Sequence, residues 1–180
     1  QDTAKQLENP AWHIHDGNPP SDTSPISFAL MLNLASAASA HNSEVMWGFI
    51  GRYVDGATPD SHPLLDQLAG FAVQYFQDFV KPTKSFRLAT DIERAAMEDL
   101  LVRLRGMDAD ERDAVKIQDE VFAAGKTQAF DNLRDWFQGL YEVLLGQSQG
   151  PRFGSFVAIY GVGETIKLIE SGLAGELASD

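Results

Sequence analysis

Apolar residues recur every three or four positions along most of the chain, and proline, glycine or capping residues separate one apolar run from the next. In residues 61–79, for example, Leu64, Leu68, Phe71 and Tyr75 follow this spacing. The spacing places the side chains on one face of a helix. No run alternates between apolar and polar residues as a half-buried strand does. The pattern therefore predicts an all-α, multi-helix bundle.

Capping signals set the expected limits of eight short helices. Thr90 followed by Glu93 has the spacing of a capping box, and Gly106 then ends that helix. Asp108 followed by Glu111 repeats the spacing and predicts the start of the next helix. The first expected helix follows Pro25, and the last follows Gly163. The six between them span about 42–50, 61–79, 90–105, 108–122, 131–145 and 151–160.

The 180 residues are enough for one domain with a buried core, or for two small subdomains at about 25–105 and 106–180. Residues 1–24 are rich in proline, glycine and small polar residues, which predicts a loop-rich connector ahead of a helical domain at 25–180. Because residue 1 is glutamine, the chain is expected to be a piece of a longer protein. The longest apolar run, 26–38, is shorter than the roughly 20 residues that span a bilayer, so no membrane contact is expected.

Composition excludes several classes of site. The absence of cysteine removes disulfide scaffolds, thiolate zinc sites and cysteine nucleophiles. The net charge of −12 argues against a binder of DNA or of polyanions in general. Positive charge is in excess only in residues 81–105, where six basic residues face four acidic ones. This basic strip is typical either of a salt-bridged helix face or of a surface that contacts phosphates.

Two motifs suggest chemistry without establishing it. His13 and His15 could both reach a metal only in an extended segment, so a histidine pair packed in a loop is the expected condition and no metal site is predicted. The run Lys81–Ser85 resembles a KMSKS loop superficially, but no glycine-rich nucleotide motif accompanies it. We therefore expect no catalytic residue and no cofactor in this chain.

Residues 144–156 place two helix ends and a helix start close together. A helix that begins at Pro151 would direct backbone amides toward the loop, and such amides favour anionic or carbonyl acceptors. Arg152 would then lie in the first turn, where a cation opposes the helix dipole. Either a nearby carboxylate or another molecule is expected to pair with it.

Three segments together resemble the C-terminal part of class I lysyl-tRNA synthetases, in chain order and over nearly the whole length. They are Asn9–Pro20 leading into Ser27–Leu30, then Trp47–Ile50 with Asp78–Lys84, and finally Leu133–Tyr141 continuing through Gly146–Phe156. The last segment also resembles the corresponding region of glutamyl-tRNA synthetases.

The resemblance implies that the parent is a cytoplasmic, ATP-dependent lysine–tRNA ligase whose HIGH and KMSKS elements lie ahead of residue 1. The chain would be its helical anticodon-binding domain, often described as an α-helix cage, and would be inactive alone. The implied partners are tRNA(Lys) and the N-terminal catalytic domain of the same enzyme, to which residues 1–24 would connect.

An anticodon-binding domain contacts phosphates through cations and stacks unpaired bases on aromatic rings. Among the rings, Phe153 is the one expected to face outward, because it follows Arg152 at a helix start. The expected tRNA-binding residues are Lys81, Lys84, Arg87, Arg103, Arg105, Lys126, Arg134, Arg152 and Phe153. Two alternatives stay open: a helical protein-interaction module without RNA binding, and the equivalent domain of a glutamyl-tRNA synthetase.

Overall fold

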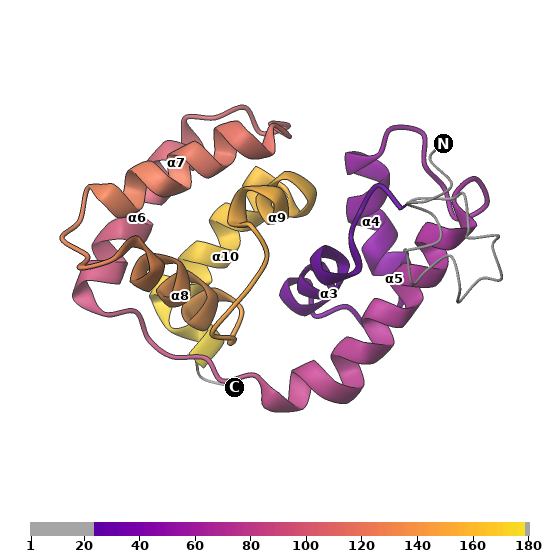
Figure 1. Ribbon diagram of the computed structural model, residues 1–180, viewed down its shortest axis with the longest axis horizontal. Coiled ribbons are helices and arrows are strands. Elements are labelled where there is room, and N and C mark those ends of the chain that lie inside the picture. Colours follow the sequence, from indigo (N-terminus) through magenta and orange to yellow (C-terminus); the bar gives the residue numbers. More distant parts are fainter. Residues whose placement is uncertain (1–23, 179–180) are drawn as a thin grey trace, which may run out of the picture.

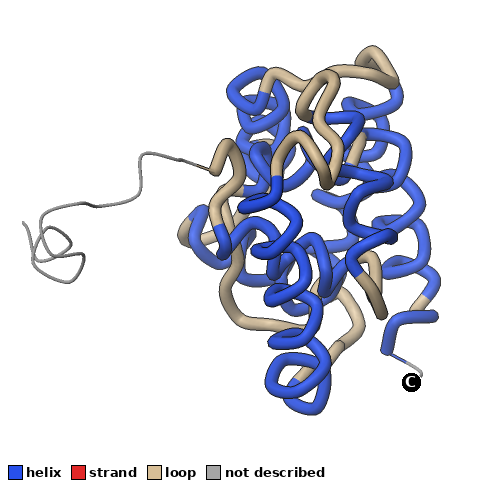
Figure 2. Tube along the Cα trace, turned by 90° about the vertical axis from the view of Figure 1, so that its right-hand side faces the viewer, coloured by secondary structure: helices blue, strands red, loops and turns tan. Residues whose placement is uncertain are grey.

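The computed structural model describes residues 24–178 as two groups of helices joined by an extended linker (Figures 1 and 2). Within this range there is no strand, so the predicted all-α fold is confirmed. The expected connector at 1–24 and the pair His13 and His15 lie, apart from residue 24, outside the described residues.

The N-terminal lobe comprises residues 24–80, and the C-terminal lobe comprises residues 91–178. The first contains α3 (Phe28–Ala37), α4 (Ser43–Tyr53), α5 (Pro63–Tyr75) and the π-helical turn η1 (Phe76–Val80). The linker, residues 81–90, opens with the 3₁₀ turn η2 (Lys81–Thr83). The second lobe contains α6 (Asp91–Arg105), α7 (Ala114–Lys126), α8 (Leu133–Leu144), α9 (Phe153–Tyr160), α10 (Val162–Ala174) and the 3₁₀ turn η3 (Glu176–Ala178).

The helices group differently from the subdomains expected at 25–105 and 106–180. Helix α6 packs against α7, α8 and α10, because its buried face, with Met97, Leu100 and Leu104, completes their core. A boundary at residue 105 would separate α6 from the helices that cover it. The linker is therefore where the two lobes divide.

Local hydrogen bonds explain why one expected helix start is confirmed and another lies further along the chain than expected. The capping box of Thr90 and Glu93 is present at the start of α6. The helix expected from residue 108 instead begins at Ala114. The Asp108 and Glu111 carboxylates accept hydrogen bonds from amides one or two residues further along, and such bonds compete with helix formation.

Helix α9 lies between the lobes and packs on α3 and α4 as well as on α7. Phe49 of α4 stacks on Tyr160 of α9 with ring centroids 5.2 Å apart, and Tyr160 stacks in turn on Phe156 at 5.1 Å. On the opposite side, a Cβ at Gly154 would lie 2.3 Å from the Ala114 carbonyl oxygen, so glycine permits the close approach of α9 to α7. The two lobes thus share one hydrophobic core.

The linker is anchored to the C-terminal lobe by Arg87. Its guanidinium binds Glu93 of α6 through two hydrogen bonds of 2.7 Å, and it donates a third, of 2.6 Å, to Glu142 of α8. Glu93 is only 6% exposed. Burial alone would raise the pKa of Glu93, but the hydrogen bonds from Arg87 and Thr90 outweigh it, so the pKa lies below its usual value.

Lys84 connects the linker to the N-terminal lobe. Its ammonium donates to the Ser36 carbonyl oxygen at 3.2 Å and lies 5.6 Å from the ring centre of Phe76 and 4.6 Å from that of Phe86. Burial lowers the pKa of Lys84 to about 8. The lysine stem therefore packs between the lobes at some electrostatic cost, which the ring faces and the carbonyl partly offset.

The close approach of α8 to Glu93 predicts that Gly139→Ala destabilises the fold. A Cβ at Gly139 would lie 2.3 Å from Oε1 of Glu93, whose carboxylate Arg87 holds in place. We expect the free energy of unfolding to fall by about 1–3 kcal/mol in chemical denaturation. Gly70→Ala is the matched control: a Cβ there meets nothing within 4 Å, so this variant should gain about 0.5–1 kcal/mol. Equal losses in both variants would contradict the packing described.

The half-buried position of Lys84 predicts a pH dependence of stability. Its pKa is about 8 in the fold, against the ordinary lysine value of 10.5 in the unfolded chain. Between these values the unfolded chain binds more protons, so stability rises with pH. From pH 8 to pH 9.5 the free energy of unfolding should rise by about 1 kcal/mol relative to that of Lys84→Met, measured by denaturation at each pH. Parallel pH profiles for the two proteins would contradict this prediction.

Candidate functional site

Carboxylates neutralise three of the expected tRNA-binding arginines. Besides Arg87, Arg103 binds Asp99 at 3.0 Å and Glu120 at 2.9 Å, and Arg105 binds Glu170 at 2.6 Å. The basic strip is thus largely a set of contacts between helices, which is the salt-bridged alternative that the sequence left open. These three guanidinium groups are already bound to carboxylates, so a phosphate would have to compete with those carboxylates for them.

Two further expected residues are held within the fold. Lys84 is half-buried and occupied at the junction of the lobes, as described above. Phe153 is fully buried and packs against Phe156 and Tyr141, with ring centroids 5.7 and 6.2 Å away. The expectation that the Phe153 ring faces outward to stack on a base is therefore wrong, because α9 lies between the lobes and turns this ring into the core.

Four of the expected cations remain exposed, and none has an ion-pair partner within residues 24–178. They are Lys81, Lys126, Arg134 and Arg152. Arg134 lies in the first turn of α8, and Arg152 is the residue immediately before α9 rather than part of its first turn. Two of the first amides of α9 are also occupied: that of Gly154 donates to the Gln118 side chain at 2.8 Å, and that of Ser155 donates to the Arg152 carbonyl at 3.0 Å. The helix end is therefore not the open anion site that the sequence suggested.

The loop between α8 and α9, residues 145–152, is fixed against both the linker and α8. The Ser85 amide donates to the Gly146 carbonyl at 3.0 Å. The Tyr141 hydroxyl donates to the Pro151 carbonyl, and the Tyr141 ring lies against Gly150. Burial raises the pKa of Tyr141 to about 12, so this donor keeps its proton at neutral pH. The loop is thus a defined surface.

Two open hollows, each of about 500 Å³, flank this loop and meet at Ser148. The first is lined by Arg134, Phe137, Gln138, Tyr141, Ser148, Gln149 and Gly150. The second is lined by Thr83, Ser85, Arg87, Glu142, Gly146, Gln147 and Ser148. Together they offer side-chain amides, hydroxyls, one unpaired guanidinium and a half-buried ring. We call this region the loop surface.

The loop surface contains polar residues that the sequence analysis did not single out. Gln138, Gln147, Ser148 and Gln149 supply both donors and acceptors, which suit the edges of unpaired bases. The polar run 147–149, between a helix end and Gly150, is the sequence pattern that indicates these residues. The sequence-based expectation instead assigned the recognition role to Arg152 and Phe153. Of the expected residues, Arg87 and Arg134 line this surface, whereas Arg103 and Arg105 do not.

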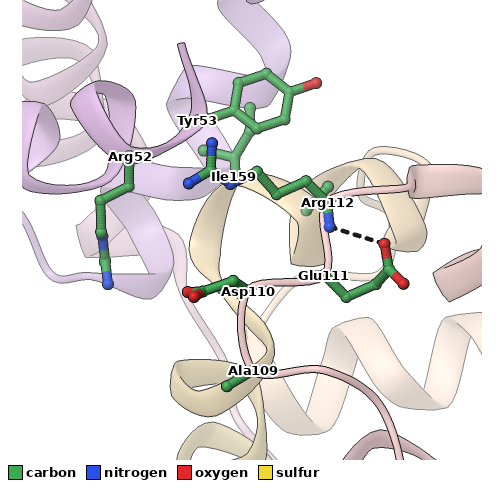
Figure 3. Close-up of a pocket in the computed structure, with 9 residues that line it drawn as sticks. Arg52, Tyr53, Ala109, Asp110, Glu111, Arg112 and Ile159 are labelled. Atoms are coloured by element: carbon green, nitrogen blue, oxygen red, sulfur yellow. Dashed lines mark hydrogen bonds between the residues drawn. The ribbon is translucent and has the colours of Figure 1, made fainter. Parts of the chain in front are cut away.

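A third hollow lies between the lobes, where Arg52 and Tyr53 of α4 face residues 109–112 (Figure 3). It encloses only about 50 Å³, which suits a water molecule or two rather than a substrate. Arg112 lies at its edge and binds Asp55 at 3.0 Å, which adds a further contact across the lobes. This hollow is part of the lobe junction.

In the part of the chain that the structure describes, no group of histidine and carboxylate side chains has a metal-binding arrangement. Within the same residues, none of the helices combines the length and apolar character needed to cross a bilayer.

Comparison with known proteins gives one consistent result. No family model and no solved structure matches the chain. A protein named lysine–tRNA ligase from Roseobacter denitrificans is 52% identical over 180 residues, which cover 100% of this chain and 34% of that protein. Lysine–tRNA ligases from Rickettsia bellii and Rickettsia felis are 43% and 42% identical over 174 residues, covering 96% of this chain and 33% of each relative. Essentially the whole chain is therefore similar to a segment that makes up about one third of the length of each of these lysine–tRNA ligases.

Proposed function

We propose that the chain is the helical tRNA-binding region of a class I lysine–tRNA ligase and that it binds the anticodon part of tRNA(Lys). The observation that carries this proposal is the 52% identity to a lysine–tRNA ligase over all 180 residues. The relatives described above are all named lysine–tRNA ligases, which favours the lysyl over the glutamyl alternative. ATP use and lysine transfer would belong to a catalytic body ahead of residue 1, in the cytoplasm.

The loop surface has the chemistry that this function needs. Unpaired anticodon bases are read through hydrogen bonds to their edges and through stacking. Gln138 and Gln149 present amide groups beside the half-buried ring of Phe137, and Arg134 supplies a cation that has no ion pair within residues 24–178. With Phe153 in the core, Phe137 is the ring of the loop surface that a base would meet.

The charge distribution supports weak attraction to phosphates combined with local recognition. The net charge of −12 repels polyanions in general, and ion pairs already occupy Arg87, Arg103 and Arg105. Only a few cations then release counterions on binding, and each phosphate contact to a single strand contributes about 0.7 to the salt slope. We expect a shallow dependence of affinity on salt.

Arg134→Ala should weaken the binding of tRNA(Lys) by about five- to tenfold and lower the salt slope by about 0.7, because one unpaired cation at the loop surface is lost. Binding is measured by titration at several salt concentrations, with an anticodon-substituted tRNA for comparison. Arg105→Ala is the matched control, since it removes the same charge from an arginine that Glu170 neutralises.

The control variant should bind as the unmodified chain does. If the chain binds no tRNA even at low salt, or does not distinguish the two tRNAs, the proposed function is wrong and the RNA-free interaction module becomes the better interpretation.

A further inference from the structure

Four aromatic side chains form an exposed face on the N-terminal lobe, which shares no lining residue with the loop surface but adjoins it where the Thr83 hydroxyl donates to the Phe79 carbonyl at 3.2 Å. Phe28, Phe71, Tyr75 and Phe79 are 38%, 56%, 45% and 62% exposed. Tyr75 lies 6.3 Å from Phe28 and 5.0 Å from Phe79 between ring centroids. We call this group the aromatic face.

The aromatic face is built by consecutive turns of one helix together with the start of another. Phe71, Tyr75 and Phe79 follow each other at intervals of four residues along α5 and the π-helical turn η1, and Phe28 is the first residue of α3. The rings, with Gln74 and Asp78, line a shallow hollow of about 260 Å³. Short π-helical turns frequently occur where a helix serves a function.

This face differs from the other exposed apolar positions of the described residues. Leu88, Val102 and Val115 are as exposed but come from three separate segments: the linker, α6 and α7. Single exposed apolar side chains are common, whereas a contiguous apolar patch with a polar rim marks an interaction site. The aromatic face is therefore a candidate contact surface.

Charge selects the kind of partner. Residues 24–80 carry five carboxylates and a single cation, Arg52, and one of the carboxylates, Asp78, lines the hollow. Phosphates would be repelled here, so base stacking on these rings would lack the cations that hold a nucleic-acid backbone. A protein surface with apolar side chains and a basic rim is complementary to this face.

The position of the face in the chain selects the occupant. The described part of the chain begins four residues before Phe28, and the chain spans only 34% of the length of the Roseobacter denitrificans relative. A body joined ahead of residue 1 belongs to the same polypeptide as the aromatic face, so dilution does not lower its effective concentration there. We propose that the aromatic face docks onto the remainder of the same ligase polypeptide. Of the proposed function, this inference needs only that the chain is part of a lysine–tRNA ligase, and it does not depend on tRNA binding.

The test uses the full-length ligase with p-benzoylphenylalanine in place of Phe71 or Phe79, irradiated with and without tRNA(Lys). Cross-linked peptides are mapped by mass spectrometry. Matched controls carry the same group in place of Val102 or Val115, which are similarly exposed but isolated. We expect cross-links within one polypeptide, to the part ahead of residue 1, about tenfold above the controls and unchanged on dilution.

Three results would each overturn the proposal: cross-links to tRNA, cross-links only between two copies and lost on dilution, or yields no higher than the controls. The tRNA titration above separates this inference from the proposed function. A ligase that cross-links internally but shows no tRNA preference would retain the docking surface and refute the function, and the reverse pair of results would refute the docking surface alone.

Discussion

The ion pairs that Arg87 makes with Glu93 and Glu142 determine the geometry on which the rest of the structure depends. One guanidinium ties the linker to the start of α6 and to the exposed side of α8. Two charge-assisted hydrogen bonds in parallel fix its orientation as well as its position. The linker then runs beside residues 145–152, where the Ser85 amide reaches the Gly146 carbonyl. Without this anchor, the second hollow of the loop surface would lose the wall that Thr83, Ser85 and Arg87 supply.

The same interaction explains how so acidic a chain could serve RNA. Ion pairs neutralise three arginines of the basic strip, so attraction to phosphates is restricted to the few cations without an ion-pair partner in residues 24–178, such as Lys81, Arg134 and Arg152. Selectivity must then come from hydrogen bonds and stacking at the loop surface. The proposed protein contact uses a different set of residues, the aromatic face of the N-terminal lobe. The two proposals together assign RNA recognition and attachment to the rest of the enzyme to separate sets of side chains.

Local signals made the helical fold predictable, while tertiary contacts decided the site. The capping box at Thr90 depends on residues three apart, so the sequence alone was sufficient to locate it. The partners of Arg103 and Arg105 include Glu120 and Glu170, which lie 17 and 65 residues away, and no local pattern indicates such pairs. Phe153 was misjudged for the same reason: its burial depends on the position of α9 between the lobes. The division at the linker also follows from packing, since α6 buries its apolar face against α7, α8 and α10, which all follow it in the chain.

The central claim is the proposal that RNA meets the loop surface and not the part of the basic strip around Arg103 and Arg105. Titration of the isotopically labelled chain with an anticodon stem-loop RNA, followed by NMR chemical shifts of the backbone amides, tests it most directly. We expect the largest shifts around Gln138 and residues 147–150, with little change near Arg103 and Arg105. Shifts concentrated on α6 and α10, with the loop between α8 and α9 unchanged, would contradict the claim.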